Sequence, residues 1–225
     1  GSNVGAAQAT IEDRLSSLAE DGFCADAYEE AIGQLSLLLP PERISTVDCN
    51  VLYRYLKNPE GDGRRLWSLS RTPYMKFAMD AMDAPRYRMV IVSGPERCGK
   101  SVGGEGYLFK CLRNGPLTDT IIYLQAGADC DSYADKEFTA FIELHPEIET
   151  KLGKSSSDRK RRHKKFAGRS VQILPANDNN LRQKEAPLII ATEIDGMRTA
   201  RKIINEIRGR QKAFGNQAKS YIESH

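Results

Sequence analysis

The stretch "VIVSGPERCGKSVGGEG", residues 90–106, decides the fold of this chain. An apolar run precedes Gly94, and four residues separate Gly94 from the Gly99-Lys100-Ser101 triplet. This spacing is typical of a phosphate-binding loop when a strand leads into it and a helix follows, as the flanking residues predict here. Glycines let backbone amides approach phosphate oxygens, and the helix adds its positive dipole end. The alternative is a plain glycine-rich turn.

The loop also predicts how a nucleotide is held. Lys100 is expected to reach the β and γ phosphates of ATP, and the hydroxyl of Ser101 is expected to bind Mg²⁺. The whole loop is expected to surround the phosphates, so the candidate nucleotide contacts are Gly94, Pro95, Glu96, Arg97, Cys98, Gly99, Lys100, Ser101 and Val102.

From Trp67 onward, short apolar runs alternate with helical patterns. This alternation predicts an α/β fold with a central, mainly parallel sheet of at least five strands, flanked by helices. The predicted strands cover residues 88–93, 120–125, 170–176, 187–192 and 219–224. The predicted helices cover residues 74–82, 100–113, 134–143 and 197–212.

An acidic motif, "TEID", occurs at the C-terminal end of the apolar run 187–192. In a parallel sheet this end of a strand lies at the edge where ligands bind. Glu193 is positioned to orient or deprotonate an attacking water, and Asp195 is a candidate to hold a metal-bound water. The alternative for both is a solvated loop acid. A glutamate beside the strand favours hydrolysis over phosphoryl transfer to a small molecule, and it indicates a P-loop NTPase of the ASCE type, named for an additional strand and a catalytic glutamate.

The N-terminal part reads differently from the rest. Residues 10–38 follow helical spacing, Pro40-Pro41 ends that pattern, and a further helix is predicted near residues 47–56. We interpret residues 1–60 as an N-terminal helical appendage and residues 61–225 as a P-loop ATPase domain. The leading Gly-Ser pair is interpreted as a cloning remnant.

Composition narrows the class of protein. The 225 residues are 40% hydrophobic, enough for one main domain. No apolar run reaches 18 residues and no basic segment precedes an apolar one at the N-terminus, so we expect neither a membrane span nor a secretory signal, and a soluble intracellular protein. Five scattered cysteines without a C-x-x-C pair argue against a disulfide framework or a zinc site.

The charge is concentrated in one segment. Residues 151–169 hold nine Lys or Arg and the single acid Asp158, a net +8, which leaves −5 for the remainder because the whole chain carries +3. With little apolar content, this segment is expected to be a mobile loop that binds the phosphate backbone of DNA. The alternative is a solvated charge run. The candidate DNA contacts are Arg159, Lys160, Arg161, Arg162, Lys164 and Lys165.

Several motifs occur in a characteristic order: "WSLSRTPYMKFAMDAMD", "GPERCGKS", "IIYLQ", "LPANDNNLR" and "LIIATEIDG". This series resembles the ATPase domain of the large terminase subunit of GpA-like type, the DNA-packaging motor of tailed double-stranded DNA phages. The resemblance covers about 70% of the chain, from Trp67 to its end. It implies ATP hydrolysis with Mg²⁺, coupled to the translocation of double-stranded DNA into a procapsid.

The resemblance implies further residue roles. Arg71 and Tyr74 occupy the adenine-binding segment, although Tyr74 could equally be a core residue. Arg97 is placed to contact the γ phosphate. Arg182 matches an arginine that reaches into the site of the next subunit; its alternative is a surface charge. Ser224 fits the small hydroxyl residue that couples hydrolysis to motion.

The chain departs from the family pattern at Thr192, where family members usually have an aspartate before the glutamate. Thr192 can still bond a metal-bound water but adds no charge, so we expect weaker Mg²⁺ binding, with Asp195 the next candidate for the acid.

The resemblance also implies partners: a homo-oligomeric ring, typically of five subunits, on the portal protein, and a small terminase subunit. It implies the cytoplasm of the infected bacterial host, with transient binding at the procapsid portal. The nuclease domain of full-length terminases is not found in this chain, and we expect no DNA cleavage. The alternatives are a nucleotide or small-molecule kinase and a helicase-like DNA-dependent ATPase.

Overall fold

The computed structural model describes residues 43–57, 63–196 and 200–224, all within the second of the two units into which the chain divides, residues 43–225. Most of the expected helical appendage, residues 1–60, lies outside the described residues, because the description begins at Arg43. Its last part does not stand apart: residues 43–57 belong to the same compact unit as the sheet described below. Among the described residues, no helix combines the length and the apolar character needed to cross a membrane.

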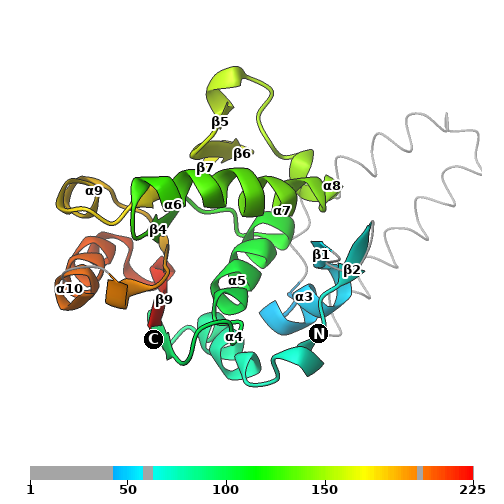
Figure 1. Ribbon diagram of the computed structural model, residues 1–225, viewed down its shortest axis with the longest axis horizontal. Coiled ribbons are helices and arrows are strands. Elements are labelled where there is room, and N and C mark those ends of the chain that lie inside the picture. Colours follow the sequence, from blue (N-terminus) through cyan, green and yellow to red (C-terminus); the bar gives the residue numbers. More distant parts are fainter. Residues whose placement is uncertain (1–42, 58–62, 197–199, 225) are drawn as a thin grey trace, which may run out of the picture. The chain divides into compact units, whose positions relative to one another are not determined.

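A seven-stranded sheet, in the order β3-β9-β8-β4-β7-β6-β5, organises this unit. The first five strands in this order are mutually parallel, and the last two are antiparallel. Figure 1 labels five of these strands, β5, β6, β7, β4 and β9, from the top of the view downwards. The predicted α/β fold with its parallel sheet is confirmed, because each predicted strand has a counterpart: β3 (Met89–Ser93), β4 (Thr120–Leu124), β7 (Arg169–Pro175), β8 (Leu188–Ala191) and β9 (Lys219–Ser224).

Both faces of the sheet are covered by helices, which explains why its central strands are continuously apolar. One face packs on α3 (Thr46–Tyr53), α4 (Met75–Asp83), α5 (Ser101–Asn114) and the helical stretch from α6 (Gly127–Ser132) through a π-helical segment (Tyr133–Phe138) to α7 (Thr139–Glu143). The other face packs on α9 (Asp178–Gln183) and α10 (Ala200–Arg210). A short helix, α8 (Pro146–Glu149), follows α7.

Alternate residues of β8 show how the sheet is sandwiched. Ile189 packs in the cluster that includes α10, and Ile190 packs in the cluster that includes α5. On the neighbouring strand, Tyr221 is the register partner of Ile190 and lies against α5 as well. A Cβ atom on Gly104 would lie 2.7 Å from the Tyr221 ring, so α5 can approach this closely only with a glycine there.

Residues 43–57 are anchored on α5 by buried polar contacts. The side-chain amide of Asn50 donates to the carbonyl oxygen of Gly106 at 3.0 Å. The guanidinium of Arg54, which is almost fully buried, forms an ion pair of 2.7 Å with Glu105. Two short strands, β1 (Tyr55–Lys57) and β2 (Arg64–Leu66), pair antiparallel beside this contact. This segment is therefore part of the scaffold that holds the helix after the glycine loop.

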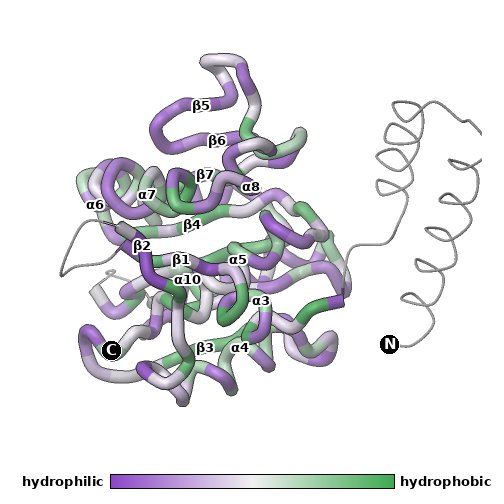
Figure 2. Tube along the Cα trace, turned by 90° about the vertical axis from the view of Figure 1, so that its right-hand side faces the viewer, coloured by the Kyte–Doolittle hydropathy of each residue, from purple (hydrophilic) through white to green (hydrophobic). Residues whose placement is uncertain are grey.

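The expectation of a mobile loop over residues 151–169 is wrong for its central part. It contains β5 (Arg159–Lys160) and β6 (His163–Phe166), a hairpin that extends the sheet from β7 and is mostly hydrophilic (Figure 2). Two apolar residues hold it, because Leu152 and Phe166 are buried and bridge to each other. Pairing with β7 satisfies the backbone, so little side-chain burial is needed to order the segment.

The glycine-loop strand lies at an edge of the sheet. Within the described residues β3 pairs on one side only, with β9. Its outward residue Ile91 is half exposed, and the nearby Tyr87 is also exposed. This edge thus combines unpaired backbone with apolar side chains.

Candidate nucleotide-binding site

The glycine loop connects the end of β3 to the start of α5, as the spacing predicts. The amide of Gly94 still donates to the carbonyl of Ser224 on β9, at 3.2 Å, which fixes the entrance of the loop. Gly99 has a φ of 80°, and a Cβ atom there would lie 2.8 Å from a methyl carbon of Thr72. Both the left-handed backbone and the close approach therefore require glycine at this position.

Lys100 points back across the loop. Its Nζ atom donates to the carbonyl oxygens of Gly94 and Pro95, at 2.7 Å each, and the residue is only 6% exposed. The hydroxyl of Tyr221 donates to the Lys100 carbonyl at 2.6 Å and ties the first residue of the helix region to β9. The ammonium group is thus held at the mouth of the loop by backbone dipoles.

Ser101, the expected Mg²⁺ ligand, donates from its Oγ atom to Oε2 of Glu223 at 3.0 Å. Glu223 lies on β9 and is only 2% exposed. Burial raises the pKa of its carboxyl to about 7; the hydrogen bond from Ser101 and the charge of Lys100 act in the opposite direction. Glu223 is not among the residues predicted from the sequence, because the run "KSYIES" holds only this one acid and nothing in its spacing shows that the acid is buried.

The acidic motif after β8 forms a 3₁₀ turn, Ile194–Gly196, at the same edge of the sheet. Glu193 is exposed and has a φ of 53°, which is uncommon for a residue with a long side chain. Asp195 is exposed too, and its carboxylate accepts a hydrogen bond of 2.8 Å from the hydroxyl of Ser224. The turn is therefore attached to the end of β9, beside the loop.

Position 192 can be placed by the register of the two strands. Ala191 on β8 pairs with Ile222 on β9, so Thr192 follows beside Glu223. The amide of Thr192 donates to the carbonyl of Tyr123 at 3.1 Å, which continues the path of β8 by one residue. The neutral hydroxyl at 192 and the buried carboxylate at 223 are thus neighbours across the sheet.

Tyr74 lies next to the loop rather than in the core. It is 49% exposed, and its hydroxyl donates to the carbonyl of Cys98. The residues that follow, Met75 and Met79, fill the core instead. Arg71 is exposed in the 3₁₀ turn just before Tyr74.

The two other candidate arginines are both exposed. Arg97 stands at the tip of the loop with a φ of 57°. Arg182 lies on α9, after β7, which is four strand positions from β3 in the sheet. With strands about 4.8 Å apart, the start of α9 is about 19 Å across the sheet from the glycine loop of its own chain.

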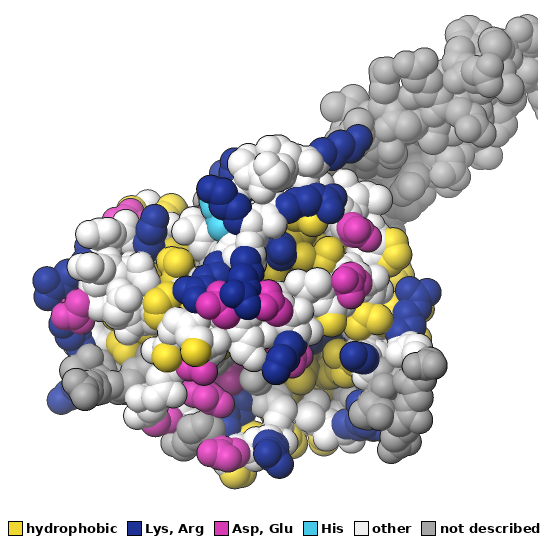
Figure 3. Space-filling view, turned by 45° about the horizontal axis from the view of Figure 1, so that its top comes forward, with side chains coloured by type: hydrophobic (Ala, Val, Ile, Leu, Met, Phe, Trp, Pro, Cys, Tyr) yellow, Lys and Arg dark blue, Asp and Glu magenta, His cyan; other side chains and the backbone are white. Residues whose placement is uncertain are grey.

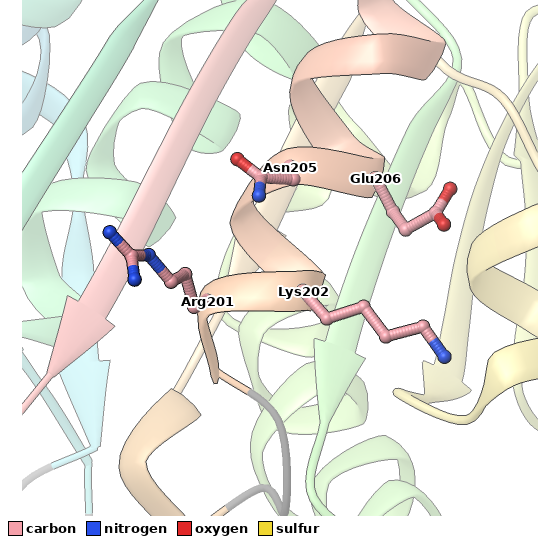
Figure 4. Close-up of a pocket in the computed structure, with 4 residues that line it drawn as sticks. All are labelled: Arg201, Lys202, Asn205 and Glu206. Carbon is pink, nitrogen blue, oxygen red and sulfur yellow. The ribbon is translucent and has the colours of Figure 1, made fainter.

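A wide open hollow lies elsewhere. It has a volume of about 540 Å³ beside α10 and is lined by Arg201, Lys202, Asn205 and Glu206 (Figure 4). No residue of the glycine loop or of the strand ends lines it, and Lys202 forms an ion pair of 2.8 Å with Asp178. This hollow is therefore distinct from the candidate site.

Some cations of the basic segment form ion pairs and others do not. Lys and Arg side chains gather on the face that bears the β5–β6 hairpin, with carboxylates among them (Figure 3). Arg161 pairs with Asp135 and Asp131, and Arg162 pairs with Asp131. The hydrogen bond from Arg162 holds the pKa of Asp131 below its ordinary value, with a smaller part from the charge of Arg161. Arg159 and Lys160 are exposed and form no ion pair among the described residues, although Nε of Arg159 donates to the carbonyl of Gly153 at 2.8 Å.

The donor set at the loop fits Mg²⁺ in a nucleotide complex. Among the described residues, no three His, Cys, Asp or Glu side chains gather into a metal site of their own. Mg²⁺ typically takes one or two protein oxygens together with substrate phosphates and waters. The Ser101 hydroxyl supplies one such oxygen, and the second oxygen of Glu223, Oε1, is buried with no hydrogen-bond partner in this structure.

Comparisons with known proteins show the family and the fold of this chain. A family model described as "Phage terminase large subunit gpA, ATPase domain" matches residues 63–225. The crystal structure of the HK97 bacteriophage large terminase is similar, with a TM-score of 0.59 and 18% sequence identity. The match covers 80% of this chain and 36% of that one, so this chain spans about a third of that terminase. No curated protein matches at the level of sequence.

Proposed function

The chain belongs to the ATPase-domain family of the phage terminase large subunit gpA, and from this premise we propose that it hydrolyses ATP to drive double-stranded DNA into a procapsid. The observation that carries the proposal is the glycine loop, with the Lys100 ammonium at its mouth and the acidic turn of β8 at the same edge of the sheet. The family does not favour the kinase and helicase alternatives.

Each loop group has a separate task in this proposal. The backbone amides between Gly94 and Ser101 hold the phosphate oxygens, and Lys100 exchanges its bonds to loop carbonyls for bonds to the β and γ phosphates. Ser101 binds Mg²⁺, which neutralises the charge of the phosphates when it is bound. Tyr74, exposed beside Cys98, offers its ring to the adenine.

Glu193 is proposed to orient the attacking water and to accept its proton. It is exposed at the edge where the γ phosphate would lie, and its backbone is left-handed, with a φ of 53°. Asp195 is committed to Ser224 by a hydrogen bond, which favours Glu193 as the base. A well-placed general base contributes about 10² to 10⁴ in rate.

The motor works, in this proposal, as a ring of identical subunits on the portal protein, with a small terminase subunit as a further partner. Arg182 is exposed and lies across the sheet from its own loop, which supports a role in the site of a neighbouring subunit. Arg97, at the loop tip, is proposed to sense the γ phosphate within its own site. The exposed cations of the β5–β6 hairpin are proposed to contact the DNA backbone.

The test is the release of free phosphate from ATP, measured with and without long duplex DNA. We expect DNA to stimulate hydrolysis and Lys100→Ala to abolish it. Glu193→Gln should lower the hydrolysis rate by about 10² or more while the protein still binds ATP. The control is Glu149→Gln, which removes an exposed carboxylate on α8, outside the site. Transfer of the phosphate to a small acceptor, without DNA stimulation, would replace the motor by a kinase.

A further inference from the structure

Glu223 is a buried acid in contact with Ser101, and an ordinary structural role does not explain it. Taking an ionised carboxylate out of water is costly unless it is paired and hydrogen-bonded. Oε2 accepts one hydrogen bond, from the Ser101 hydroxyl, whereas Oε1 is buried with no hydrogen-bond partner in this structure. A buried polar atom left in this way points to a catalytic role or to a missing ligand.

The neighbouring acid on α5 is in a different position. Glu105 forms an ion pair with the buried Arg54 at 2.7 Å and accepts a hydrogen bond from Tyr133 at 3.3 Å. The charge of Glu105 is therefore compensated within the fold. Glu223 has no ion pair of this kind among the described residues, and the hydroxyl that donates to it, that of Ser101, is the one expected to bind Mg²⁺.

Glu223 also stands beside position 192, where this chain has a threonine instead of the aspartate that the resemblance leads us to expect. Thr192 follows Ala191 on β8, beside Glu223 in the parallel register with β9. Both residues face α5, because each comes two positions after a residue, Ile190 or Tyr221, that packs on that helix. A carboxylate moved from position 192 to position 223 shifts sideways by one strand, about 4.8 Å, and keeps its face and its level in the sheet.

We propose that Glu223 supplies, from the neighbouring strand, the carboxylate that position 192 lacks, and that with Ser101 it holds the Mg²⁺ of the bound nucleotide. This inference rests on the proposed function, because it assumes that the loop binds ATP with Mg²⁺. A glutamate has one methylene more than an aspartate, and this added reach lets the carboxylate meet Ser101 from β9. The charge expected after β8 is thus relocated rather than lost.

The test compares nucleotide affinity with and without the metal. A fluorescent non-hydrolysable ATP analogue is titrated into the protein in Mg²⁺ and again in EDTA, and the ratio of the two affinities is the readout. Glu223→Gln should lower this ratio by about 10- to 100-fold, the usual cost of losing such a metal-site group. The affinity in EDTA should stay the same or rise, because a negative charge near the triphosphate is removed. Glutamine has the same shape and still accepts from Ser101, so thermal unfolding should show an intact fold.

A second variant tests the exchange of positions directly. Thr192→Asp should restore much of the ratio in the Glu223→Gln background but add little to the wild-type protein, since the two carboxylates occupy one role. Glu149→Gln is the matched control and should leave the ratio within about twofold.

Three results would overturn the inference. One is a ratio that Glu223→Gln leaves unchanged, and another is a loss of the ratio in Asp195→Asn alone. The third is an equal gain from Thr192→Asp in both backgrounds. If the wild-type protein binds the analogue equally well in Mg²⁺ and in EDTA, the Mg²⁺ requirement of the proposed function fails first. That result can be told apart from a failure of the Glu223 inference, because it is seen in the wild-type protein without any variant.

Discussion

The hydroxyl of Ser224 donates a hydrogen bond of 2.8 Å to the carboxylate of Asp195 and so joins the end of β9 to the turn after β8. Glu193 precedes this turn with a φ of 53°, a conformation that persists only when its surroundings hold it. The same strand contributes the Ser224 carbonyl, which accepts from Gly94 at the entrance of the glycine loop. The end of β9 therefore connects the phosphate loop to the turn that carries the proposed base.

This connection predicts that Ser224→Ala separates hydrolysis from motion. The glycine loop keeps its backbone bond to β9, so ATP hydrolysis without DNA should stay within about threefold of wild type. DNA stimulation and DNA translocation should fall much further, because the acidic turn is released from the strand. Thr150→Ala, which removes a hydroxyl from the end of α8, is the control. Equal losses in basal and DNA-stimulated hydrolysis would mean that Ser224 serves the chemical step itself.

The exposure of Arg182 predicts complementation between two inactive variants. Lys100→Ala lacks a working loop and Arg182→Ala lacks the arginine, and each alone should lose about 10³-fold or more in rate. In an equal mixture, roughly a quarter of the sites in a ring pair an intact loop with an intact arginine from the neighbour. Phosphate release should therefore reappear on mixing under packaging conditions. A mixture as inactive as its components would assign Arg182 to its own site or to the surface.

The ion pairs of the basic segment predict an unusual gain of DNA affinity. Asp131 and Asp135 neutralise Arg161 and Arg162, so the double variant Asp131→Asn with Asp135→Asn should free two cations for phosphate contacts. Duplex affinity should rise, and the slope of log affinity against log salt should steepen by about one to two units. The double variant Arg159→Gln with Lys160→Gln should lower the duplex affinity and make its salt slope shallower. A slope unmoved by both pairs of changes would place the DNA contact on another surface.

His145 predicts a loss of stability in mild acid. Its Nε2 atom accepts from the amide of Tyr55 at 2.9 Å, and its Nδ1 atom contacts the carbonyl of Phe141 at 2.6 Å, so the buried ring is neutral. Burial lowers its pKa, against the opposing effect of the Phe141 carbonyl and of Glu147; Arg54 and Arg64 lower it further.

Because the folded-state pKa is depressed, the neutral ring contributes its stability fully above about pH 6.5, the unfolded value, and this contribution is lost as the pH falls toward the folded value. The urea midpoint should drop between pH 7.5 and pH 5.5, and it should drop less in His145→Gln. The pKa of His163 is lowered as well, mainly by its burial, and accounts for part of the remaining slope. A slope identical in the variant would exclude His145 as its source.

The sheet was predictable because its strands are short apolar runs with both faces covered, and such runs are visible in a single sequence. The loop was predictable for a different reason: Gly94, Gly99 and Lys100 perform local tasks that depend on spacing alone. Both features are set by residues close together in the chain.

Glu223 and His145 could not be found in this way. The importance of Glu223 arises from the register of β9 against β8, which puts it beside Thr192, and from the packing of α5 on the same face. His145 is explained only by its contact with Tyr55, ninety residues earlier in the chain. The roles of both residues depend on contacts between segments that are distant in the sequence.

The hairpin within residues 151–169 was not predicted, because amino-acid composition indicates whether side chains can be buried but not whether the backbone pairs with another strand. Its charges predict a solvated chain, and most of its side chains are indeed polar. Once Phe166 is buried and β6 pairs with β7, the backbone bonds of an existing sheet are enough to order it. A template strand can thus organise a segment that would not fold alone.

The open side of β3 has a practical consequence for anyone who handles the protein. An exposed strand with apolar residues such as Ile91 invites edge-to-edge adhesion between molecules at high concentration. The same strand runs straight into Gly94, so adhesion there would distort the cradle for the nucleotide. A stored sample that no longer binds ATP should be checked for aggregation by light scattering before the loss is attributed to the nucleotide site itself.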